Sequence, residues 1–289
     1  MSDKPARPML EWRQPETPEE QAVPQIRFAT ARLSTGVRVH YAEQGDPHGE
    51  PLVCLHGYAD SWCSYSRLLP LLPARYHAYA LSQRGHGDSD RPADGYAVED
   101  LAADVVAFLD AVGVPRATLI GDSSGAITTR RVAEQYPERV ARLLLIAAPI
   151  RLPVSEATLG LQEAIGALED PVPSDFVREF QAGTTYVPLP EAFAERVLAE
   201  SLKLPARVWR LALDGLLEAD DSDHLDRIAA PTLLIWGERD RFIPREEQAW
   251  LAGAIPHARL AVYPETGHAP HWERPERVVR DLGTFMPVP

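Results

Sequence analysis

The sequence is poor in cysteine, in cationic side chains and in long apolar runs, and each shortage excludes a class of protein. Two cysteines, Cys54 and Cys63, are too few for a disulfide framework and predict a reduced, cytoplasmic location. The 29 Lys and Arg against 42 Asp and Glu give a net charge of −13, which disfavours nucleic acid or an anionic membrane as partner. No apolar run approaches the about 20 residues of a membrane helix, and the N-terminus lacks the apolar core of a signal peptide.

The segment over residues 1–24 is rich in proline and glutamate and is predicted to be a flexible extension. After it the chain alternates between strand and helix patterns. Strands are predicted over Ile26–Leu33, Val37–Glu43, Pro51–His56, His77–Leu81, Ala117–Gly121 and Arg142–Ala148. Helices are predicted over Trp62–Leu72, Val98–Val112 and Ser124–Tyr136. Such alternation is typical of a mainly parallel sheet covered by helices on both faces.

Residues 150–226 break this alternation and predict an inserted helical cap. Four helical stretches separated by prolines are expected there, over Ser155–Leu168, Ser174–Gln181, Pro190–Leu202 and Pro205–Ala219. Alternation resumes with Thr232–Trp236, Glu246–Ala254, Arg259–Tyr263 and Pro275–Phe285. The predicted α/β core therefore comprises residues 25–149 and 227–289.

A candidate nucleophile lies where a predicted strand meets a predicted helix. Gly121-Asp122-Ser123-Ser124-Gly125 has the pattern Gly-x-Ser-x-Gly, in which small neighbours permit a sharp turn that lifts the serine hydroxyl above the sheet edge. The competing interpretation is a glycine-rich turn whose serine only caps the helix.

Serine needs an adjacent base to act as a nucleophile, and that base needs an orienting carboxylate. His268 follows the last predicted strand, and Asp240 follows the strand before it, so both are expected at the same sheet edge as Ser123. His271 and Glu238 are the competing histidine and carboxylate.

A tetrahedral intermediate also needs preorganised N–H donors. The N–H groups of Ser124 and of Tyr58, in the loop His56-Gly57-Tyr58, are the candidates for this oxyanion hole. No Cys/His cluster has zinc spacing and no loop is suited to phosphate, so neither a metal nor a cofactor is predicted.

Taken together, the motifs resemble the α/β-hydrolase-fold serine hydrolases that carry a helical cap. The matching segments are His56-Gly57, Arg84–Ser89, Gly121–Gly125, Trp236–Pro244 and Gly267-His268. The resemblance implies an eight-stranded, mostly parallel sheet and the chain order Ser…Asp…His. Epoxide hydrolases and haloalkane dehalogenases of similar shape carry Asp as nucleophile, and Ser123 argues against both.

Two positions depart from the family pattern. Relatives often carry His where this chain has Asp122, and Asp where it has Ser82. An acid beside the nucleophile either opposes the negative charge that develops on the oxyanion or is paired with an arginine, and the sequence leaves both alternatives open.

Aromatic and aliphatic side chains are available to form a substrate pocket over Ser123. The residues predicted to line it are Trp62 from the core and Phe180, Tyr186, Trp209 and Leu213 from the cap, with helix packing as the competing role. The sequence thus predicts hydrolysis of a carboxylic ester or lactone with an apolar part, through an acyl-enzyme. Carbon–carbon bond or amide hydrolysis, cofactor-free perhydrolysis and a ligand-binding receptor are the alternatives.

Overall fold

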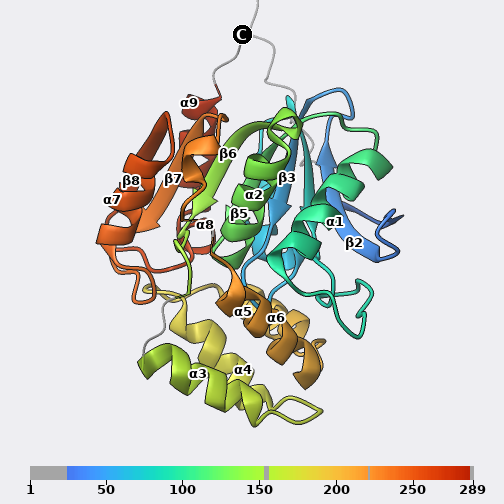
Figure 1. Ribbon diagram of the computed structural model, residues 1–289, viewed down its shortest axis with the longest axis vertical. Helices are drawn as coiled ribbons and strands as arrows, with labels where there is room; N and C mark the ends of the chain where they lie inside the picture. Colours follow the sequence, from blue (N-terminus) through green and yellow to red (C-terminus); the bar gives the residue numbers. More distant parts are fainter. Residues whose placement is uncertain (1–24, 153–155, 221, 287–289) are drawn as a thin grey trace, which may run out of the picture.

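The computed structural model describes residues 25–152, 156–220 and 222–286 (Figure 1). The extension predicted over residues 1–24 lies outside the described residues. Within those ranges, no helix has both the length and the apolar character needed to cross a membrane.

The described part of the chain forms one sheet of eight strands in the order β1-β2-β4-β3-β5-β6-β7-β8. Their bounds are β1 Arg27–Arg32, β2 Arg38–Gly45, β3 Glu50–Leu55, β4 Tyr76–Leu81, β5 Ala117–Asp122, β6 Val140–Ile146, β7 Thr232–Gly237 and β8 Ala258–Tyr263. Strand β2 pairs antiparallel with β1 and β4, whereas every other neighbouring pair is parallel. Strands β4, β5 and β7 are buried along their whole length because both faces of the sheet are covered.

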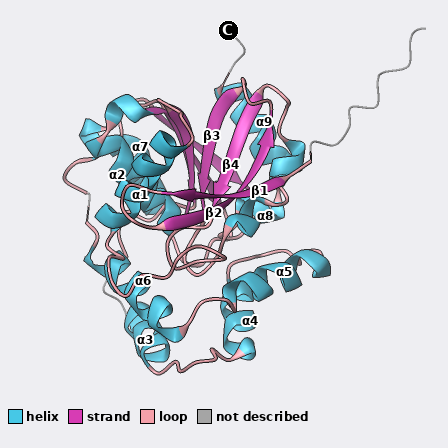
Figure 2. Ribbon diagram, turned by 90° about the vertical axis from the view of Figure 1, so that its right-hand side faces the viewer, coloured by secondary structure: helices cyan, strands magenta, loops and turns pink. Residues whose placement is uncertain are grey.

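Helices cover the two faces of the sheet and form two apolar clusters with it (Figure 2). One face packs against α1 (Val98–Ala111), α2 (Ser124–Gln135) and α7 (Arg245–Ala254). The other packs against α8 (Pro270–Glu273), α9 (Pro275–Phe285) and two 3₁₀ turns. The predicted fold class, a mostly parallel sheet between helices, is confirmed.

Among the described residues, four α-helices lie between β6 and β7 in the sequence, and we call them the inserted helices. Their bounds are α3 Glu156–Gly166, α4 Ser174–Gly183, α5 Glu191–Ser201 and α6 Ala206–Glu218. They lie together below the sheet in Figure 1, on the side of the loops that follow β3 and β5. Pro173, Pro190 and Pro205 directly precede α4, α5 and α6, where a fixed φ and a missing N–H are tolerated.

The helix predicted over Trp62–Leu72 does not form as one element. The structure has two 3₁₀ turns there, η1 at Trp62–Tyr65 and η2 at Leu69–Leu71. Pro70 lies inside the predicted span, and a proline in a helix interior both removes a hydrogen bond and clashes with the preceding turn. The prediction of one continuous helix was wrong because Pro70 interrupts the span.

Candidate active site

Ser123 occupies a strained turn between β5 and α2. Its φ of 51° and ψ of −115° are rare for a residue with a side chain. The two flanking glycines make the turn possible: a Cβ on Gly121 would lie 2.4 Å from the Gly125 carbonyl oxygen, and one on Gly125 would lie 2.3 Å from the Leu55 carbonyl oxygen. The turn therefore presents the Ser123 hydroxyl at the edge where the parallel strands end.

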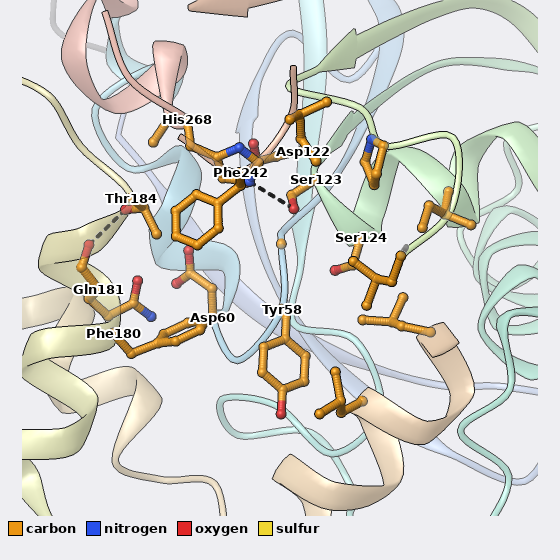
Figure 3. A pocket seen from close by; sticks show the side chains of 18 of the residues that line it. Tyr58, Asp60, Asp122, Ser123, Ser124, Phe180, Gln181, Thr184, Phe242 and His268 are labelled. Atoms are coloured by element: carbon orange, nitrogen blue, oxygen red, sulfur yellow. Dashed lines mark hydrogen bonds between the residues drawn. The ribbon is translucent and has the colours of Figure 1, made fainter. Parts of the chain in front are cut away.

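Ser123, His268 and Asp240 form a continuous chain of hydrogen-bond contacts. The His268 Nε2 atom lies 2.9 Å from Ser123 Oγ, and its Nδ1 atom lies 2.8 Å from Asp240 Oδ2 (Figure 3). The other carboxylate oxygen, Oδ1, accepts the backbone N–H groups of Phe242 at 2.8 Å and Ile243 at 3.1 Å. These two bonds fix the carboxylate, and the carboxylate in turn fixes the imidazole.

The competing residues lie elsewhere. His271 is fully buried, and its Nε2 atom contacts the Ser64 hydroxyl at 2.9 Å rather than Ser123. Glu238 is exposed to solvent. The structure thus brings Ser123, Asp240 and His268 together, and it separates His271 and Glu238 from the serine.

The pKa of His268 is raised above its ordinary value. Burial by itself lowers the pKa, but the charge and hydrogen bond of Asp240 more than offset this, and Asp122 adds to the increase. The protonated imidazole is therefore stabilised at the place where it would accept a proton from Ser123.

The loop after β3 lies against the serine. A Cβ on Gly57 would meet Ser123 Cβ at 3.4 Å, and the next residue, Tyr58, turns its side chain away so that its hydroxyl donates to the Trp209 carbonyl oxygen at 2.5 Å. Ser124 is the first residue of α2, so its N–H has no partner within the helix.

A largely apolar pocket opens over Ser123. Its aromatic and aliphatic wall consists of Tyr58, Ile127, Leu152, Leu161, Phe180, Leu213, Leu216, Phe242, Ile243 and Trp272. Phe242 lies beside His268, with ring centroids 5.0 Å apart and ring planes tilted by 56° (Figure 3). Two acids, Asp60 and Asp122, also face the pocket, and none of its described lining residues is Lys or Arg.

The structure places two of the five residues predicted for the pocket wall at this pocket. Phe180 and Leu213 line the pocket, whereas Trp62, Tyr186 and Trp209 do not. Trp62 packs edge-to-face on Phe28, with ring centroids 4.7 Å apart.

Tyr186 and Trp209 lie away from the pocket wall for opposite reasons, exposure to solvent and burial behind other side chains. Tyr186 is 42% exposed and lies under the Arg239 guanidinium, 5.6 Å from its ring centroid. Trp209 is fully buried behind Tyr58 and Phe180, which separate it from the cavity. Periodicity places an aromatic on a buried helix face, but it does not distinguish the cavity wall from the layer behind it.

Sequence reasoning missed Glu273, a buried residue that links the inserted helices to the His268 loop. Its carboxylate accepts the N–H groups of Gly267 at 2.8 Å and of Tyr186 and Val187 at 3.2 Å each. Burial raises the pKa of Glu273, although these three N–H groups act in the opposite direction. A position five residues after His268 in a short helix gave no signal, since its partners come from a distant loop.

Among the described residues, no arginine forms an ion pair with Asp122, the acid beside the nucleophile. His271 Nδ1 lies 3.7 Å from Asp122 Oδ1, and the charge of His268 also acts on Asp122. No group of three or more His, Cys, Asp or Glu side chains within the described ranges is arranged to hold a metal ion.

The sheet order, the strained serine and the adjacent histidine define a hydrolase of the α/β-hydrolase type. Residues 50–275 match the sequence profile of the α/β hydrolase fold family, and the chain belongs to this family.

The chain is 32% identical, over 87% of its length and 92% of the relative, to a 2-hydroxy-6-oxononadienedioate/2-hydroxy-6-oxononatrienedioate hydrolase of Burkholderia vietnamiensis. It shares its fold with an esterase from Exiguobacterium antarcticum, with a TM-score of 0.78 at 22% identity over 89% of this chain and 98% of that chain. It also shares it with the enol-lactonase from Burkholderia xenovorans LB400, with a TM-score of 0.77 at 21% identity over 89% and 99%.

Proposed function

We propose that the protein is a serine hydrolase that cleaves a carboxylic ester or lactone through an acyl-enzyme. The observation that carries this proposal is the contact chain from Ser123 through His268 to Asp240 at the base of an apolar pocket. Neutral His268 accepts the serine proton as Ser123 Oγ attacks the carbonyl carbon, and Asp240 stabilises the resulting imidazolium.

The later steps use the same groups in reverse. The N–H groups of Ser124 and Tyr58 bind the oxyanion, and His268 then gives its proton to the leaving alcohol. A water molecule next gives a proton to His268 as its oxygen attacks the acyl-enzyme carbonyl. When the acid leaves, His268 returns this proton to the Ser123 oxygen, which restores the free serine.

The pocket supports a neutral substrate with an apolar acyl or alcohol part. Its polar side chains near the serine include Asp60 and Asp122, and no described lining residue offers a positive charge to a substrate carboxylate. A dienedioate such as the one in the relative's name carries two carboxylates. Because no described lining residue is Lys or Arg, this pocket offers neither carboxylate a cationic partner. Carbon–carbon bond hydrolysis remains the second candidate because the sequence likeness of 32% supports it.

A chain-length series of neutral aryl esters and lactones, assayed beside the dienedioate, tests the proposal. We expect turnover of the neutral substrates and a loss of about 10⁴ to 10⁶ in kcat for Ser123→Ala. The melting temperature of the Ser123→Ala variant should equal that of the native protein, because the Ser123 hydroxyl is at the pocket surface. Ester turnover by Ser123→Ala above a few per cent, or turnover of the dienedioate alone, would overturn the ester assignment. A protein that an active-serine probe does not label would instead fit a receptor.

A further inference from the structure

A second set of polar side chains lies beside the catalytic serine and connects the two acids of the pocket. His271 Nδ1 faces Asp122 Oδ1 at 3.7 Å, and neither atom has a hydrogen-bond partner among the described residues. His271 Nε2 lies 2.9 Å from Ser64 Oγ, and the Ser64 hydroxyl also interacts with the Asp60 carboxyl. Trp272 Nε1–H donates to the same Ser64 oxygen at 2.9 Å. Asp122, His271, Ser64 and Asp60 therefore lie along one buried series of polar contacts. A shift of about 0.5 Å would bring the first of these contacts, between Asp122 and His271, to hydrogen-bond distance.

When Asp60 and Asp122 share a single proton, the middle of this path allows two consistent proton arrangements. Burial lowers the pKa of His271 to about 3, so its ring is neutral and has one N–H and one lone pair. If Ser64 donates to ionised Asp60, His271 donates from Nε2 to Ser64 and its bare Nδ1 faces Asp122, which must then carry a proton. If Ser64 donates to His271, Nδ1–H faces an ionised Asp122 and Asp60 carries the proton.

The two arrangements interconvert without any change in the number of protons. The Asp122 proton passes to His271 Nδ1, the Nε2 proton passes to Ser64, and the Ser64 proton passes to Asp60. Burial raises the pKa of both Asp122 and Asp60, so both acids hold protons more strongly than exposed carboxyls do. Asp60 Oδ1 accepts the Ser61 backbone N–H at 2.7 Å, whereas Asp122 Oδ1 has no partner among the described residues. The negative charge is therefore better stabilised on Asp60, which favours the arrangement with the proton on Asp122.

The location of that proton matters because Asp122 touches the loop of the candidate oxyanion hole. A Cβ on Gly57 would lie 2.8 Å from Asp122 Oδ2, so this carboxyl packs directly against the residue before Tyr58. A negative charge here would oppose the oxyanion that forms on Ser123 attack, whereas a protonated carboxyl would not.

We propose that His271 and Ser64 act as a proton relay that keeps Asp122 neutral by placing the negative charge of the acid pair on Asp60. The proposal rests on the proposed serine hydrolase function and assigns Asp122, His271, Ser64 and Asp60 as positioning residues for it. The titratable groups that face Asp122 from the elements around it are Asp60, Tyr65, Asp240, His268 and His271, and Asp60 also faces Cys63 and Glu200.

The pH dependence of kcat/KM for a neutral aryl ester between about pH 5.5 and 9.5 tests the relay. In the native protein we expect a rise as His268 loses its proton, then a fall of about tenfold per pH unit above about pH 8 as Asp122 ionises. Asp122→Asn cannot ionise and should abolish the alkaline fall while it keeps the acid rise.

Two further variants test the link between the acids. Asp60→Asn removes a negative charge that raises the pKa of Asp122. In this variant the alkaline fall of kcat/KM should therefore begin at lower pH. Ser64→Ala interrupts the path and should move the fall in the same direction. The matched control is Ser66→Ala, because Ser66 belongs to the same turn and contacts Cys63 rather than His271. It should keep the native profile.

An alkaline fall that survives in Asp122→Asn would overturn the proposal, as would one that neither Asp60→Asn nor Ser64→Ala moves. Labelling of Ser123 by a fluorophosphonate at neutral pH keeps this test separate from that of the function. If Ser123 is labelled and esters are hydrolysed while the variants retain the native profile, the relay alone fails. If Ser123 is not labelled, the proposed function itself fails. Melting curves identify any variant that does not fold, and the remaining variants then decide.

Discussion

Replacement of Trp209 by alanine tests whether this side chain supports the pocket wall or forms part of it. The indole is fully buried and makes edge-to-face contacts with Tyr58, Phe176 and Phe180, with ring centroids 5.4 to 5.5 Å apart. Removal of a buried Trp or Phe side chain costs about 3–5 kcal/mol of stability. An unfolding entropy of about 0.6 kcal/mol/K for a chain of this length converts that loss into a fall in Tm of about 5–8 °C.

Leu213→Ala is the matched comparison, because Leu213 lies one helical turn further along α6 and does line the pocket. Both variants lose buried apolar contacts, so both should melt at lower temperature. Only Leu213→Ala enlarges the cavity. It should therefore change the ranking of short and long acyl chains, by roughly 10- to 200-fold between substrates.

The assay is kcat/KM for a chain-length series of esters, measured beside a melting curve for each variant. Trp209→Ala should slow all substrates alike, because Tyr58 and Phe180 still separate position 209 from the cavity. A reordered chain-length preference in Trp209→Ala with an unchanged Tm would refute this reasoning and return Trp209 to the pocket wall.

Three further outcomes are expected. Asp240→Asn should lower kcat about 10⁴-fold by favouring the wrong His268 tautomer, whereas a change at the exposed Glu238, Glu238→Gln, should have little effect on kcat. A larger loss of kcat in Glu238→Gln than in Asp240→Asn would show that Glu238 is the orienting carboxylate. The acid rise of kcat/KM should lie above the ordinary histidine pKa of 6.5, because Asp240 favours the imidazolium, and a rate independent of pH between about 5 and 8 would contradict a histidine base. Glu273→Gln should turn an amide N–H₂ group toward backbone N–H donors. Melting curves should show a loss of stability of about 1–3 kcal/mol, and kinetics should show a lower kcat. An unaffected kcat would show that Glu273 does not position the His268 loop.

The order of strands and helices was predictable because its signals are local. Apolar spacing, proline and glycine act over a few residues, and they placed β5, α2 and the turn at Ser123 correctly. The same local chemistry failed at residues 62–72, where Pro70 outweighs helical spacing. Asp240 and His268 each follow one of two successive strands. This was enough to predict that both lie at the same edge of the sheet, since parallel strands end at the same edge.

The sequence alone determined which residues can do chemistry, and the tertiary structure decided which of them touch. Trp209 and Leu213 share one helix face, yet only Leu213 reaches the cavity, because aromatic side chains from α4 and from the β3 loop cover Trp209. Asp122 was visible as an acid beside the nucleophile, but its contact with His271 depends on the packing of α8 against β7 and the η1 turn. A protonation state is set by the groups within a few ångströms and by the water they exclude, and for Asp122 those groups come from segments far apart in the chain.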